Sequence, residues 1–156
     1  MDPLQIALVQ MRCEKGAIDA NLAAIEAALA AAARRGAEVA CFPEMSITGY
    51  INPAERPGAV LSLHDPAVAR FVGLTRGLDL IAIAGMVEAN PAGKPFITQL
   101  VARGGELIGF YRKNTIIDEE AEWFAPGAGV PVFDHLRCRF SLAICADIES
   151  EPVFAA

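Results

Sequence analysis

The first 42 residues alternate between apolar runs and an alanine-rich segment, and this pattern restricts the fold more than any other feature. The run LQIALVQM (4–11) is typical of a buried strand, and VACF (39–42) of a second one. The segment between them is typical of a helix, with Asp19 or Asn21 as its N-cap and Gly36 after its end. Two strands joined by a helix at this spacing form a βαβ unit with parallel strands. We therefore expect an α/β fold.

The rest of the chain adds antiparallel pairs to this unit. A short helix over 66–75 leads into LDLIAIAGMVE (78–88), a nearly continuous apolar strand. The segment 95–113 contains RGGE between two apolar runs, which predicts a hairpin, and 130–145 reads as another hairpin. The order is a mixture of βαβ and hairpin connections, without repeats.

Composition and charge argue against several classes of protein. Although 54% of the residues are hydrophobic, no stretch of about 18 residues is free of charge, so no membrane span is expected. The net charge of −6 argues against a nucleic-acid partner. The start MDPLQIALVQ is acidic where a signal peptide is basic, and the four cysteines form no Cys-x-x-Cys pair. We expect a cytoplasmic protein without a metal site.

Three reactive side chains follow apolar runs. Glu44 comes two residues after VACF, Lys113 directly after LIGFYR, and Cys145 directly after FSLAI. Ligands bind beyond the carboxyl ends of parallel strands, because loops and helix N-termini gather there. The sequence therefore predicts that a carboxylate, an ammonium group and a thiol converge in one pocket.

These three groups suffice for nucleophilic catalysis without histidine. A carboxylate can accept the thiol proton, the thiolate can attack a carbonyl or nitrile carbon, and lysine can stabilise the oxyanion. Each residue also has a structural interpretation. Cys145 can be the last buried residue of a strand, Lys113 a surface lysine and Glu44 an acid at a helix N-terminus.

Four segments resemble the nitrilase superfamily of carbon–nitrogen hydrolases. CFPEMSITGY (41–50), FYRKNTI (110–116) and LAICADIESEP (142–152) resemble its three signature segments, and they stand in the family's order. DEEAEWFAPG (118–127) is similar to the segment that carries a supporting glutamate. Because four segments match in order, the resemblance is far more specific than one motif would be.

The resemblance implies a role for each matching residue. Glu44 corresponds to the general base, Lys113 to the oxyanion lysine and Cys145 to the nucleophile that forms a thioester acyl-enzyme. Glu120, seven residues before Gly127, corresponds to the second glutamate that positions the lysine. By default its acidic neighbourhood would be a solvated face. The residues implied near the substrate pocket are Tyr50, Phe124 and Ala146.

The resemblance also implies a fold and a substrate class. The family fold is a four-layer α-β-β-α sandwich, and the segment EPVFAA (151–156) stops where a helix is expected to continue. We therefore expect residues 1–156 to form one carbon–nitrogen hydrolase domain cut short at its C-terminus. The implied substrate is a small amide, carbamoyl compound or nitrile, the implied assembly is a homo-oligomer, and no cofactor is implied.

Other functions fit the same residues. A truncated chain would keep the signature segments without completing the pocket, and would then be inactive. A nitrilase or an acyl transferase of the same superfamily would use the same thiol. A redox-sensing role for Cys145 is a further alternative. An amidase is preferred among these hypotheses.

Overall fold

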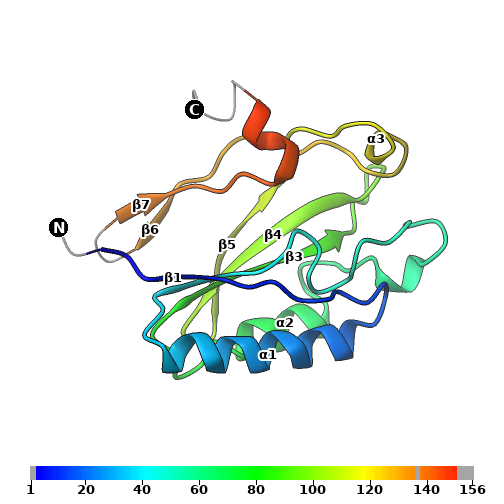
Figure 1. The fold of residues 1–156 in the computed structure, drawn as a ribbon. Coiled ribbons are helices and arrows are strands. Elements are labelled where there is room, and N and C mark those ends of the chain that lie inside the picture. Colours follow the sequence, from blue (N-terminus) through cyan, green and yellow to red (C-terminus); the bar gives the residue numbers. More distant parts are fainter. Residues whose placement is uncertain (1–2, 136–137, 151–156) are drawn as a thin grey trace.

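A computed structural model describes residues 3–135 and 138–150 of the chain. Its main feature is a five-stranded sheet in the order β1-β2-β3-β4-β5 (Figure 1). The first three strands are parallel, whereas β4 is antiparallel to both β3 and β5. As a result, β5 runs in the same direction as β1, β2 and β3. The strands are β1 (Ile6–Leu8), β2 (Val39–Cys41), β3 (Ile81–Glu88), β4 (Phe96–Arg103) and β5 (Glu106–Arg112).

Two helices, α1 (Ile18–Arg34) and α2 (Pro66–Gly73), cover one face of this sheet (Figure 1). Helix α1 buries Leu22, Ile25 and Leu29 on one stripe, at the spacing that an amphipathic helix requires. These side chains join α2 and the strands in one apolar core. The predicted α/β class and the βαβ unit are therefore confirmed.

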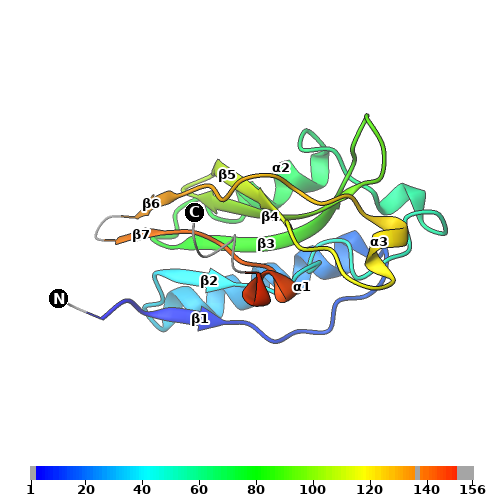
Figure 2. The same ribbon diagram turned by 90° about the horizontal axis from the view of Figure 1, so that it is seen from above.

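The opposite face of the sheet carries a second, two-stranded sheet (Figure 2). Its strands β6 (Phe133–His135) and β7 (Cys138–Phe140) form an antiparallel hairpin. Phe133 packs in a cluster with Ile81 and Val101 of the large sheet. The described residues thus form a helix layer, a sheet and a hairpin layer. Shorter elements are η1 (Pro57–Ala59), α3 (Glu120–Trp123) and η2 (Cys145–Glu149).

The N-terminal βα region differs from the prediction in two details. Strand β1 has only three residues and lies at the sheet edge, where Ile6 is 53% and Leu8 79% exposed, so the expected buried strand over 4–11 is wrong. Neither Asp19 nor Asn21 caps α1, which begins at Ile18. Asn21 is instead buried and donates to the backbone oxygens of Glu14 and Ile47. It ties the helix to the loop after β2.

The segment before Cys145 also differs from the prediction. Between residues 138 and 144, only Cys138–Phe140 pairs in a sheet. Residues 141–144 lead to Cys145 without sheet pairing. A short 3₁₀ helix, η2, begins at Cys145 where a helix was expected. The segment EPVFAA lies outside the described residues. No helix in the described part of the chain is both long and apolar enough to cross a bilayer.

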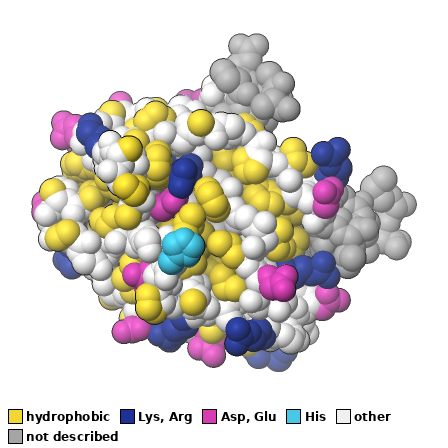
Figure 3. Space-filling view, turned by 180° about the vertical axis from the view of Figure 1, so that it is seen from behind, with side chains coloured by type: hydrophobic (Ala, Val, Ile, Leu, Met, Phe, Trp, Pro, Cys, Tyr) yellow, Lys and Arg dark blue, Asp and Glu magenta, His cyan; other side chains and the backbone are white. Residues whose placement is uncertain are grey.

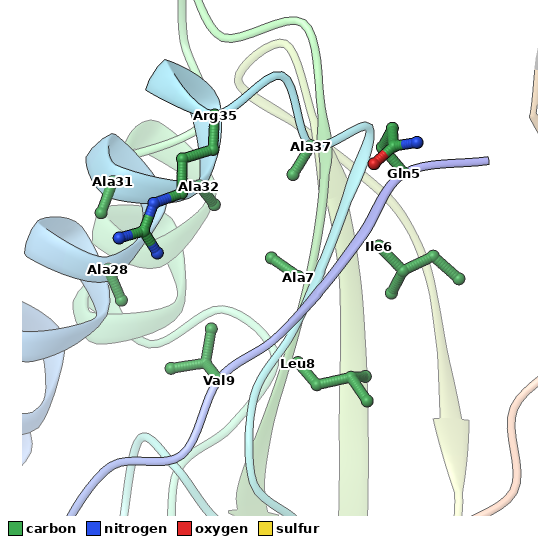
Figure 4. A pocket seen from close by; sticks show the side chains of 10 residues that line it. All are labelled: Gln5, Ile6, Ala7, Leu8, Val9, Ala28, Ala31, Ala32, Arg35 and Ala37. Atoms are coloured by element: carbon green, nitrogen blue, oxygen red, sulfur yellow. The ribbon is translucent and has the colours of Figure 1, made fainter. Parts of the chain in front are cut away.

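Two surface features lie apart from the predicted site. A cavity of about 400 Å³ separates the β1 edge from the alanine face of α1 (Figure 4), and none of its lining residues belongs to the signature segments. In Figure 4, Ala7 and Val9 point toward α1, whereas Ile6 and Leu8 point away from it. The face opposite to the view of Figure 1 mixes apolar side chains with acidic and basic ones (Figure 3). Neither feature positions the residues discussed below.

Candidate active site

Lys113 lies at the centre of a buried ionic cluster at the carboxyl end of β5. Its side chain is fully buried, and its Nζ donates to Glu44 Oε1 at 2.8 Å and to the two Glu120 oxygens at 2.7 and 2.9 Å. Glu44 follows β2 and Lys113 follows β5, and these strands run in the same direction. Their carboxyl ends therefore meet at one edge of the sheet, as predicted. The interpretation of Lys113 as a surface lysine is wrong.

Burial and the neighbouring charges shift the pKa values of Lys113 and Glu44. Burial alone would lower the pKa of Lys113, but its hydrogen bonds and charge interactions with Glu120 and Glu44 raise that pKa above its ordinary value. Burial raises the pKa of Glu44, and the hydrogen bond from Lys113 only partly offsets it. Lys113 therefore stays protonated, while Glu44 is a stronger proton acceptor than an exposed carboxylate.

Glu120 is the buried member of an otherwise exposed acidic run. It is 8% exposed, whereas its neighbours Glu119 and Glu122 are exposed, so the solvated-face interpretation fails for this residue. Besides Lys113, it accepts a hydrogen bond at 2.9 Å from the Tyr50 hydroxyl. Tyr50 is partly exposed, and its pKa is raised by burial and then by the hydrogen bond to Glu120. Glu120 thereby joins the loop after β2 to the lysine.

Cys145 occupies a strained turn beside this cluster. Its side chain is exposed, and its backbone has a φ of +47°, a conformation that costs a residue other than glycine about 1–3 kcal/mol. Two residues further on, Asp147 accepts hydrogen bonds from the Tyr111 hydroxyl and the Thr115 N–H, which lie on either side of Lys113 in the chain. The turn that carries the thiol therefore lies next to the chain segment that carries Lys113.

The structure separates the three predicted pocket residues. Tyr50 and Glu120, with residues 117–119, line a cavity of about 500 Å³ beside the cluster. Phe124 is buried and packs in an apolar cluster with Tyr111, and Ala146 is buried directly after the thiol. Neither of them lines this cavity, and Phe124 instead lines a separate one with residues 114–116.

Gly85 of β3 positions Glu44, and the sequence interpretation missed it. Its N–H donates to Ser46 Oγ at 3.1 Å, and its carbonyl accepts from the Ile47 N–H at 2.8 Å. A Cβ atom at this position would lie 1.6 Å from the backbone oxygen of Glu44. The only sequence signal was a glycine within an apolar strand, which often marks the close approach of another backbone.

We predict that Gly85→Ala destabilises the protein by about 1–3 kcal/mol, because the Glu44 loop must move to admit the methyl group. Denaturant unfolding measures the difference. Gly93→Ala is the matched control, because a Cβ atom there meets nothing within 4 Å. Equal stability of the two variants would show that the Glu44 backbone does not depend on contact with β3.

The comparison with protein families assigns the chain to a class. The family described as carbon-nitrogen hydrolase matches residues 5–153. The chain therefore belongs to the carbon–nitrogen hydrolase family, and the predicted nitrilase-superfamily resemblance is confirmed.

The chain is similar to individual proteins with several different activities. It is 29% identical over 154 residues to a glutamine-dependent NAD(+) synthetase of Acinetobacter baylyi, covering 96% of this chain and 28% of the synthetase. It is 31% identical to a formamidase of Pseudomonas syringae over 76% of this chain and 36% of that protein. A mutant of an amidase from Nesterenkonia sp. AN1, solved after Michael addition of acrylamide at its active-site cysteine, superposes with a TM-score of 0.84 at 26% identity. The match covers 97% of this chain and 61% of the amidase. The chain thus spans only part of the length of these relatives.

Proposed function

We propose that the protein hydrolyses the carbon–nitrogen bond of a small amide through a thioester on Cys145. The observation that carries this proposal is the position of Lys113, fully buried between the carboxylates of Glu44 and Glu120. Removing a lysine and a glutamate from water costs free energy, so a buried ionic cluster of this kind favours a functional role over a purely stabilising one. Family membership and the amidase and formamidase relatives support the same reaction class.

In the first half of the reaction, Glu44 accepts the proton of the Cys145 thiol. The thiolate sulfur then bonds to the amide carbon, and the carbonyl oxygen becomes an oxyanion. Protonation neutralises Glu44, which weakens its hold on Lys113 and releases an Nζ–H group toward the oxyanion. Glu120 keeps its own hydrogen bonds to Lys113 throughout.

The second half of the reaction restores the enzyme. The tetrahedral adduct collapses, the carbon–nitrogen bond breaks, and Glu44 returns its proton to the departing amine or ammonia. Glu44 next accepts a proton from water, whose oxygen attacks the thioester carbon. The carbon–sulfur bond breaks, Glu44 passes this proton to the departing thiolate, and the carboxylic acid and the free thiol result.

Glutamine is a second candidate for the amide. The protein is similar to glutamine-dependent NAD(+) synthetases from two organisms over 95% or more of its own length. Glutamine carries a primary carboxamide, which the same three residues could cleave. Ammonia release from formamide, butyramide, acrylamide and glutamine compares the two candidates directly. Conversion of a nitrile, or transfer of the acyl group to an added amine, would instead favour a nitrilase or an acyl transferase.

Glu44→Gln tests the role of the base. It keeps the shape of the side chain and removes the proton acceptor, so kcat/KM should fall about 10²-fold or more. Glu44 acts in its ionised form, and its pKa is raised. As the pH falls, native activity should therefore begin to decline at a higher pH than that at which an ordinary glutamate becomes protonated. Glu26→Gln, on the exposed face of α1, is the control. Native kcat/KM in Glu44→Gln would assign the base to another residue.

A further inference from the structure

We propose that Asp147 is a positioning residue that holds the Cys145 turn against the end of β5, beside the chain segment that carries Lys113. This inference deepens the proposed function and rests on it. Asp147 was not among the residues that the family resemblance assigned a role. It is nevertheless one of the few carboxylates that are fully buried among the described residues.

The carboxylate of Asp147 joins three parts of the chain. Its Oδ2 accepts from the Tyr111 hydroxyl at 2.7 Å and from the Ile144 N–H at 2.9 Å. Its Oδ1 accepts from the Thr115 N–H at 2.7 Å. Tyr111 stands two residues before Lys113 and Thr115 two residues after it. The turn that carries the thiol is therefore fastened to the chain on both sides of the lysine.

These hydrogen bonds restrain the backbone next to Cys145. Cys145 has a positive φ, and such a conformation persists only where its surroundings determine it. The bond to the Ile144 N–H restrains the residue just before Cys145, and the backbone N–H of Asp147 donates to the Ile144 carbonyl at 3.0 Å. An asparagine at 147 presents an NH₂ group to one of these donors and must lose at least one of the three bonds.

The charge of Asp147 also affects the pKa of Glu44. Burial is the main cause of the raised pKa of Glu44, Lys113 lowers that pKa, and the charges of Glu120 and Asp147 raise it further. Removing the charge of Asp147 therefore moves the titration of Glu44 to lower pH. A residue that only holds the turn in place would not cause this shift.

The experiment follows the modification of Cys145 by iodoacetamide between pH 4 and pH 9 in the full chain, with peptide mass spectrometry as the readout. In Asp147→Asn, the rate at pH 7 should fall at least about tenfold, because the thiol is no longer aligned with its base. The acid limb of the pH profile, where the modification rate declines as the pH falls, should also move to lower pH. Tyr111→Phe removes one bond and keeps the charge, so it should slow the reaction about threefold without moving the limb.

Glu149→Gln, an exposed acid on the same turn, is the matched control and should react at the native rate. Native rate and native pH dependence in Asp147→Asn would overturn the inference. If Asp147→Asn does not fold, Tyr111→Phe decides, and a native rate in that variant would overturn it. Failure of the proposed function looks different: the native chain would release ammonia from no amide, while its Cys145 reactivity still depended on Asp147.

Discussion

Replacing Cys145 with alanine is expected to abolish amide hydrolysis, with kcat lower by about 10⁴-fold or more. The variant keeps the Lys113 cluster, because none of the hydrogen bonds that hold it involves the thiol. It loses the only atom that can carry the acyl group in the proposed mechanism. Alanine at a positive φ is also no worse tolerated than cysteine, so the fold should persist. Ammonia release under saturating amide measures the effect.

Cys13→Ala is the control for this variant. Cys13 is partly buried in the segment before α1, and burial raises the pKa of its thiol, which makes it a poor nucleophile. Its removal should leave kcat unchanged. Activity in Cys145→Ala comparable with that of Cys13→Ala would remove Cys145 from the mechanism.

Replacing Lys113 with methionine is expected to cause the largest combined loss of stability and activity. Methionine fills a similar volume but leaves the half-buried carboxylate of Glu44 and the buried carboxylate of Glu120 facing each other without a cation. Breaking a buried ion pair in this way costs about 3–5 kcal/mol. The oxyanion loses its charged donor as well, which lowers kcat by about 10²–10³-fold. Denaturant unfolding and ammonia release measure the two losses.

The stability loss in Lys113→Met should depend on pH. The pKa of Glu44 is already raised by burial, and loss of the lysine removes the interactions that lower it, so this pKa rises further above its unfolded value. Protonation of Glu44 then stabilises the folded state, so part of the loss should be recovered as the pH falls below the raised pKa. Lys15→Met, at an exposed position, is the control. A pH-independent loss in Lys113→Met would contradict the ionic description of the cluster.

The sequence predicted the part of the site that depends on strand direction. Strands β2 and β3 are parallel, and two reversals, from β3 to β4 and from β4 to β5, make β5 run in the same direction as β2. This brings Glu44 and Lys113 to one edge of the sheet. The apolar runs and the RGGE turn indicated the strands and the β4–β5 hairpin, but not the antiparallel pairing of β3 with β4. The family resemblance then distinguished Glu120 from its acidic neighbours, and the structure shows it buried against Lys113.

The sequence could not predict contacts that join segments far apart in the chain. Gly85 and Glu44 approach because the loop after β2 packs directly against β3, and a single glycine in an apolar run does not reveal its partner. Asp147 looked like one acid in an acidic segment, yet its partners are Tyr111 and Thr115, more than 30 residues away. The apolar run before Cys145 resembled a strand, because hydrophobicity reports burial and not sheet pairing.

The central claim is that Cys145 carries the acyl group, and mass spectrometry of the quenched reaction tests it most directly. The native chain is mixed with butyramide, quenched in acid within one turnover and digested with a protease. We predict that the peptide containing Cys145 gains the mass of a butyryl group, and that hydroxylamine removes it, as it does from a thioester. Continued ammonia release with no adduct on that peptide, or an adduct on Cys13 or Cys41 instead, would contradict the mechanism.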